Sequence, residues 1–99
     1  MYLINITIKP GRSATEQETL LAAHRAWFAK HAASGDFLLL GPYTDSDQPA
    51  GIIIAHAENR VALDNILATD SYYPDKAHYE IREFTAKHIA ADLPAYTNQ

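Results

Sequence analysis

The side chains best suited to chemistry near neutral pH are the five histidines, because the chain contains no cysteine. On a helical wheel at ~100° per residue, His24 and His31 fall within one apolar stripe. The stripe also contains Leu20, Leu21, Trp27 and Phe28. A histidine in such a stripe either fills space at the edge of the core or lines a pocket, where partial burial keeps it neutral and usable as a base. His24 is therefore the first candidate for a general acid or base, with core filling as the alternative.

Asp70 is the second candidate. It precedes Ser71-Tyr72-Tyr73-Pro74 in a predicted connection, where an aspartate commonly serves as a cap or turn residue. A carboxylate in this connection can also bond one imidazole nitrogen of His24. It would then fix the tautomer and raise the basicity of the other nitrogen. Asp70 is thus predicted either to orient His24 or only to shape the turn.

Glycine and aromatic residues around these two candidates suit a planar, partly apolar ligand. Ordinary core and interface packing is the alternative for the aromatic side chains. Backbone N–H groups near Gly41 and the hydroxyl of Tyr43 are candidates for binding a developing oxyanion. The predicted substrate-binding residues are Trp27, Phe28, Gly41, Tyr43 and Tyr72, with Tyr73 as a further aromatic candidate.

The sequence lacks the motifs of metal sites, serine nucleophiles and nucleotide cofactors. A metal site formed by His24, His31 and a carboxylate lacks the HxxxH or a similar spacing of ligands. No serine lies in a GxSxG context, and neither a GxGxxG nor a Walker motif is present. The sequence therefore predicts chemistry without a metal or a cofactor.

Length and charge narrow the class of protein. The 99 residues favour one domain, residues 1–99, with a single modest core. Twelve acidic and eight scattered basic residues give a net charge of −4, which argues against nucleic-acid binding. No apolar run approaches the ~20 residues of a membrane helix, and the start of the chain lacks the features of a secretion signal. We expect a soluble, cytoplasmic domain of mixed α and β structure.

The predicted elements follow from hydrophobic period, caps and turn residues. Residues 2–8 alternate with period two, as in a strand. Thr15 and Glu18 have the spacing of a capping box, and Gly35 suits a left-handed C-terminal cap, so a helix is expected over 16–34. The remaining predictions are strands over 36–40, 51–56 and 79–85, a helix over 58–68 with Val61, Ala62, Leu63, Ile66 and Leu67 as its buried side, and a tail over 86–99.

This β-α-β-β-α-β order is that of an α+β, ferredoxin-like fold, in which both helices cover one face of an antiparallel sheet. The other face would be open. Leu38, Leu40 and Ile53, or their neighbours, would then meet water, and an apolar patch of that kind is uncommon on a soluble monomer. The pattern predicts a homodimer formed through the open face, as in dimeric α/β barrels.

The chain resembles the YciI-like (YCII-related) family over roughly residues 2–84. The matching pieces are His24 in Ala23-His24-Arg25-Ala26-Trp27-Phe28, the segment 34–42 ending in Gly41-Pro42, the apolar strand 51–55, Asp70 in Thr69-Asp70-Ser71-Tyr72, and Tyr79-Glu80-Ile81-Arg82-Glu83-Phe84. The family usually has Asp-Pro-aromatic at the second site, where this chain has Ser71 in place of the proline.

The resemblance implies a ferredoxin-like homodimer with pockets near its interface and a His–Asp catalytic pair, which maps onto His24 and Asp70. One branch of the family is similar to dehydrochlorinases that eliminate HCl from a chlorinated hydroxyhydroquinone during aromatic degradation. Related dimeric barrels include muconolactone isomerases. The leading hypothesis is therefore a cofactor-independent lyase or isomerase acting on a small hydroxylated aromatic compound or lactone. The alternatives are a dimeric binding or accessory protein for a small metabolite and a structural subunit without pocket chemistry.

Overall fold

The computed structural model describes residues 1–99 and confirms the predicted order of elements. The elements are β1 (Tyr2–Ile8), α1 (Ala14–Ser34), β2 (Phe37–Pro42), β3 (Ala50–Ala55), α2 (Arg60–Leu67), β4 (Ala77–Glu83) and a C-terminal 3-10 helix, η1 (Leu93–Tyr96). The four strands form one sheet in the order β2-β3-β1-β4, and each neighbouring pair is antiparallel. The architecture is therefore α+β and agrees with a ferredoxin-like fold.

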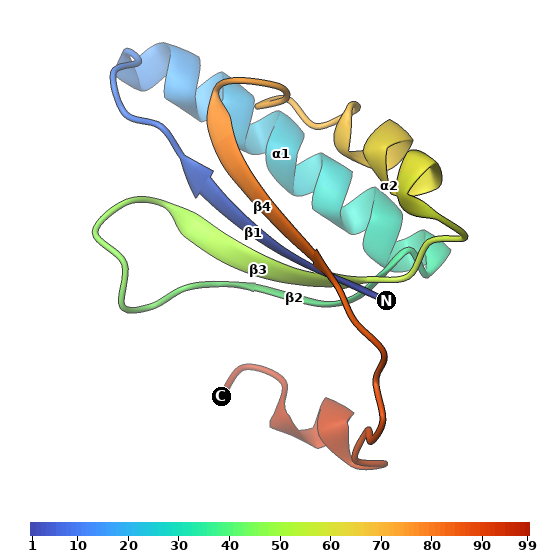
Figure 1. Ribbon diagram of the computed structural model, residues 1–99. Helices are drawn as coiled ribbons and strands as arrows, with labels where there is room; N and C mark the ends of the chain where they lie inside the picture. Colours follow the sequence, from blue (N-terminus) through green and yellow to red (C-terminus); the bar gives the residue numbers. More distant parts are fainter.

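Both helices lie on the same face of the sheet (Figure 1). The strict alternation in β1 explains this arrangement, because Tyr2, Ile4, Ile6 and Ile8 are all buried while the residues between them are not. From the helices, Trp27 and Leu63 reach the same core. The full buried apolar core comprises Tyr2, Ile4, Ile6, Ile8, Trp27, Phe37, Ile53, Ala55, Leu63, Leu67, Tyr72 and Ala77.

Helix α1 begins two residues earlier than the sequence pattern predicts. Its N-cap is Ser13, whose hydroxyl accepts a hydrogen bond from the backbone N–H of Glu16, so the prediction of Thr15 as the cap was wrong. Ser13 and Glu16 have the same three-residue spacing as Thr15 and Glu18, and the earlier pair begins the helix. The C-terminal prediction is confirmed, since Gly35 adopts a left-handed φ of 86°.

Several predicted details of the other elements were wrong. β2 ends two residues later than expected, at Pro42, and β4 begins two residues earlier than expected, at Ala77. Ile53 faces the helices and is buried, because it lies opposite Ile4 in the sheet. Val61 was expected on the buried side of α2 but is 68% exposed, so the buried contacts of this short helix come from Leu63 and Leu67.

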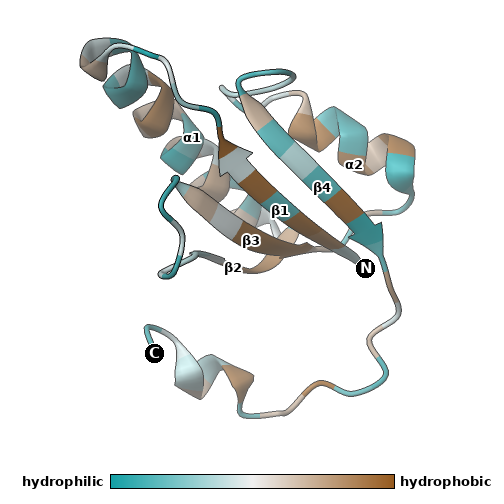
Figure 2. Cartoon of the chain, turned by 60° about the vertical axis from the view of Figure 1, so that its left-hand side comes forward, coloured by the Kyte–Doolittle hydropathy of each residue, from teal (hydrophilic) through white to brown (hydrophobic).

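The face of the sheet away from the helices has no cover from α1 or α2. Leu39, Ile54 and Leu3 lie side by side in register across β2, β3 and β1, on the face opposite the buried Ile53 and Ile4. Figure 2 shows that the apolar colouring concentrates on β1 and β3. The C-terminal tail borders the open face, where Ile89 and Leu93 line a cavity together with Leu39 and Ile54. Neither helix has both the length and the hydropathy required to cross a membrane.

Candidate active site

His24 lies in the middle of α1 on the side that faces the sheet. Its side chain is 7% exposed and is packed among aromatic rings: Phe28 with a centroid separation of 4.2 Å, Tyr72 at 5.1 Å and Trp27 at 5.7 Å. These contacts hold the plane of the imidazole ring and leave it few alternative rotamers. The apolar stripe of the helix thus places a histidine, rather than an aliphatic residue, against the inner face of the sheet.

Asp70 meets His24 although 46 residues separate them in the chain. The carboxylate oxygen Oδ1 lies 2.6 Å from Nδ1 of the imidazole, and the Asp70 side chain is fully buried. Because an ionised carboxylate can only accept, Nδ1 is the protonated nitrogen of a neutral His24. The second oxygen, Oδ2, accepts a hydrogen bond from the Tyr79 hydroxyl, also at 2.6 Å. Both oxygens of this buried anion are therefore compensated.

The turn that carries Asp70 is tied to α1 on both sides of the carboxylate. The indole N–H of Trp27 donates to Ile66 O and Thr69 Oγ1, at 3.1 and 3.0 Å. The hydroxyl of Ser71 donates to the backbone carbonyl of Leu20 at 2.8 Å. At the residue after Asp70, the Ser71 side chain thus adds a hydrogen bond between the turn and the helix. The distance between His24 and Asp70 is fixed by these flanking contacts as well as by the pair itself.

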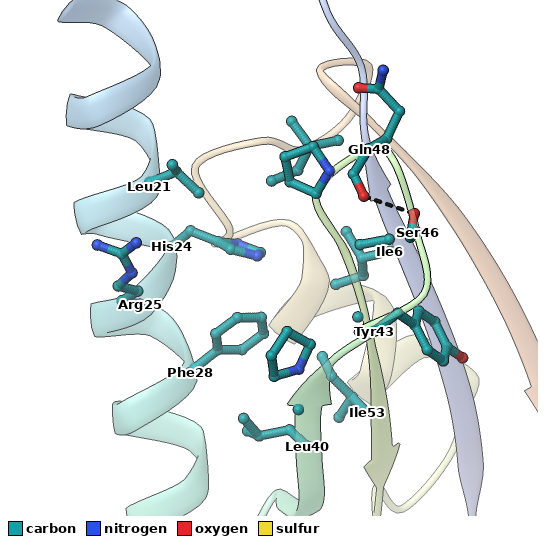
Figure 3. A pocket seen from close by; sticks show the side chains of 16 residues that line it. Ile6, Leu21, His24, Arg25, Phe28, Leu40, Tyr43, Ser46, Gln48 and Ile53 are labelled. Atoms are coloured by element: carbon teal, nitrogen blue, oxygen red, sulfur yellow. Dashed lines mark hydrogen bonds between the residues drawn. The ribbon is translucent and has the colours of Figure 1, made fainter. Parts of the chain in front are cut away.

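A cavity of about 400 Å³ lies between α1 and the sheet, beside His24. In Figure 3 the imidazole of His24 points from α1 into this cavity, and Phe28, Leu40 and Ile53 form its apolar wall. The loop after β2 contributes polar atoms through Ser46 and Gln48. The complete lining consists of Ile6, Ile8, Leu21, His24, Arg25, Phe28, Leu40, Gly41, Pro42, Tyr43, Ser46, Gln48, Pro49, Ala50, Gly51 and Ile53.

One nitrogen atom at the cavity is placed to accept a proton from a ligand. His24 Nε2 makes no hydrogen bond and is not among the sealed polar atoms, so a ligand in the cavity can reach it. No carboxylate lines the cavity, because Asp70 lies behind the imidazole ring. Burial and the neighbouring Asp70 carboxylate raise the pKa of Tyr79 far above its usual range, so Tyr79 keeps its proton and donates to Asp70. The arrangement can take a proton from a ligand at Nε2 while Asp70 stabilises the resulting imidazolium.

Only some of the predicted substrate-binding residues line the cavity. Phe28 and Gly41 line the cavity, whereas Trp27 and Tyr72 do not and are buried in the core around His24. Tyr43 lines the cavity, but its hydroxyl donates to Asn5, on the open face of the sheet, and its backbone N–H donates to Ala50 O. Both Tyr43 donors are thus bonded to groups of the chain itself, Asn5 and Ala50.

A second histidine on α1 forms a similar pair in a closed environment. His31 Nδ1 lies 2.8 Å from Asp36 Oδ2, and the same oxygen accepts from Ser34 Oγ at 2.8 Å. The hydrogen bonds from His31 and Ser34 hold the pKa of Asp36 below its usual range. His31 Nε2 is buried without a partner. No three histidine, aspartate or glutamate side chains gather in a cluster that could hold a metal ion.

Tyr79 is the site residue that sequence reasoning missed. It shares the helix-facing side of β4 with Ala77, and it lies opposite Ile6, a residue of the buried face of β1. The period-two pattern could have indicated an inward-facing hydroxyl, but the predicted strand began at residue 79 itself. The other aromatic candidate, Tyr73, packs against Tyr79 with a centroid separation of 5.6 Å and is 38% exposed.

Comparison with known protein families gives one result. Residues 1–86 match the YCII-related domain, which leaves only the C-terminal tail outside the match. A search of curated proteins found no match. The matched segment includes both members of the buried pair, His24 and Asp70, and every strand of the sheet. The chain therefore belongs to the YCII-related domain family.

Proposed function

We propose that the protein is a cofactor-independent acid–base enzyme, a lyase of the dehydrochlorinase type or an isomerase, that acts on a small hydroxylated aromatic compound. The observation that carries the proposal is the buried His24–Asp70 pair at 2.6 Å, with the free imidazole nitrogen directed to a cavity. His24 is the general acid and base, and Asp70 orients it and stabilises the imidazolium.

The chemistry balances without an oxidant or a metal. Consider a chlorinated ring with two hydroxyl groups para to one another and chlorine beside one of them. His24 moves the proton of the neighbouring hydroxyl to the carbon that bears chlorine, which gives the keto tautomer. His24 then accepts the proton of the second hydroxyl, the electron pair of that O–H bond moves into the ring, and chloride leaves with the C–Cl electron pair. The products are a quinone and HCl.

The cavity supports this substrate class. Phe28, Leu40 and Ile53 present apolar surface to a flat ring, while Ser46 and Gln48 provide polar atoms at the loop. The developing phenolate meets no carboxylate in the wall. An isomerase acting on a small lactone would use His24 to take a proton from one carbon and return it to another carbon, and no leaving group would depart.

The test measures chloride release and quinone formation from chlorohydroxyquinol. We expect turnover by the parent protein and a fall in kcat/KM of roughly 10²–10⁴-fold in His24→Gln, the usual contribution of a positioned general acid or base. His31→Gln is the matched control, because His31 lies on the same helix, is equally buried and pairs with a carboxylate, but does not line the cavity. It should retain activity.

Two outcomes would contradict the proposal. Unchanged kcat/KM in His24→Gln would remove His24 from the mechanism. Saturable binding of hydroxylated aromatic compounds by the parent, with no product from chlorinated substrates or lactones, would instead identify the alternative, a binding protein for a small metabolite.

We also propose that the protein forms a homodimer through the open face of the sheet. A symmetric contact would bring the row Leu39, Ile54 and Leu3 of one copy against the same row of the other. The chain's own tail does not fill this region. It leaves a cavity of about 590 Å³ at the end of the open face, whose lining is largely hydrophobic and includes Leu39 and Ile54 together with Ile89 and Leu93 of the tail.

A further inference from the structure

Tyr79 is the only side chain besides His24 that donates a hydrogen bond to the Asp70 carboxylate. The two donors take different oxygens, His24 at Oδ1 and Tyr79 at Oδ2, each at 2.6 Å. Tyr79 comes from β4, whereas His24 comes from α1, so the carboxylate is held from both the sheet and the helix. Rotation of the Asp70 side chain would break both contacts at once.

The two hydrogen bonds also compete for the same negative charge. A donor at Oδ2 stabilises the carboxylate and draws electron density from Oδ1, which weakens the attraction of Asp70 for a proton on His24. In the buried setting of Asp70 this competition is poorly screened by solvent. The strength of the Tyr79 hydrogen bond therefore affects how readily His24 gives up its proton.

We propose that Tyr79 is a positioning residue that, through Asp70, sets the pH range in which His24 changes its protonation state. The inference rests on the proposed function only for its catalytic consequence, since the proton equilibrium of His24 exists without substrate. Other groups surround the pair less directly. Tyr72 and Tyr73 lie in the connection before β4. Arg25, on α1, lines the same cavity as His24, and Arg12, just before α1, interacts electrostatically with Tyr72.

The test follows the His24 ring signals by NMR as a function of pH in the ligand-free protein. Tyr79→Phe keeps the ring and removes only the hydroxyl that donates to Asp70 Oδ2, so the pH dependence of the His24 ring signals should move to higher pH. Tyr72→Phe is the matched control. Its ring packs edge-on against His24, but its hydroxyl donates to Gln17 and not to Asp70, so the midpoint should stay in place.

A second variant tests the same inference if the Tyr79→Phe protein does not fold. 3-Fluorotyrosine at position 79 retains the hydroxyl and makes it a stronger donor, so the His24 midpoint should move in the opposite direction, to lower pH. A midpoint that is the same in the parent, Tyr79→Phe and fluorotyrosine proteins would overturn the inference. Equal shifts in Tyr79→Phe and Tyr72→Phe would also overturn it, because they would show a general effect of removing a buried hydroxyl.

The pH profile of kcat/KM separates this role from simple structural support. If Tyr79 acts through Asp70, the acid limb of the profile moves with the NMR midpoint, whereas a purely structural loss lowers the whole profile without moving it. The two proposals fail differently. Absence of turnover with every substrate would refute the proposed function and leave the NMR shift intact. An active Tyr79→Phe protein in which neither the acid limb of the kcat/KM profile nor the NMR midpoint of His24 moves would refute only the role of Tyr79.

Discussion

The two buried histidines of α1 show how access, rather than pairing, distinguishes a site from a structural contact. Both place Nδ1 beside a carboxylate, at 2.6 Å for His24 and 2.8 Å for His31. The difference lies at Nε2, which is accessible in His24 and sealed without a partner in His31. A sealed nitrogen cannot exchange a proton with a ligand. The His31–Asp36 pair is therefore assigned to the junction between α1 and β2.

The lowered pKa of Asp36 predicts a pH-dependent contribution to stability. A carboxyl group whose native pKa lies below its unfolded value stabilises the fold above the ordinary aspartate pKa of about 4, and this contribution is lost as the pH falls through the native pKa. Asp36→Asn should lower the free energy of unfolding at neutral pH by at most about 1 kcal/mol, because the carboxylate is 36% exposed and partly screened.

Urea denaturation at several pH values checks this expectation. The difference between the parent and Asp36→Asn should shrink toward zero in acid. Asp47→Asn, in the exposed loop before β3, is the control and should show no comparable trend. A deficit of Asp36→Asn that stays constant down to acid pH would contradict the assignment of the effect to the Asp36 charge.

Sequence reasoning reached the individual candidates His24 and Asp70 but could not determine which atoms meet. Helical spacing was sufficient to place His24 on the apolar side of α1. The roles of Trp27 and Tyr72 could not be separated from that of Phe28, because all are aromatic and only the three-dimensional packing decides which ring borders the cavity. Tyr43 illustrates the same limit, since its hydroxyl crosses to the other face of the sheet.

At the scale of elements, hydrophobic periodicity predicts which helices and strands exist, and in what order, better than it predicts the residues at which they begin and end. Two overlapping capping signals, at Ser13 and Thr15, compete for the start of α1, and the local sequence does not rank them. The start of β4 two residues earlier than predicted depends on pairing of Ala77 and His78 with β1, which is a long-range contact. That shift matters for the site, because it gives Tyr79 its place within the strand beside Asp70.

At the scale of the whole molecule, the half-covered sheet follows from the order of elements, whereas the identity of its cover does not. The homodimer proposal predicts that the parent sediments as a dimer at micromolar concentration. Ile54→Lys places a charge in the centre of the apolar row and should shift the protein to a monomer. Val61→Lys is the control, because Val61 is exposed on α2, on the covered side of the sheet.

A parent protein that sediments as a monomer at concentrations of tens of micromolar would contradict the dimer. A dimer that persists in Ile54→Lys would place the contact on another surface. Neither result would affect the His24–Asp70 pair, which is formed within one chain.

The central claim is that Asp70 holds His24 so that a proton-accepting nitrogen faces the cavity. The most direct measurement is a long-range ¹⁵N–¹H NMR spectrum of the histidine rings, recorded above the pH at which the His24 ring signals stop changing. The account predicts that His24 carries its proton on Nδ1 and leaves Nε2 unprotonated. A neutral His24 with its proton on Nε2 would contradict the account, because the cavity would then face a donor instead of a base.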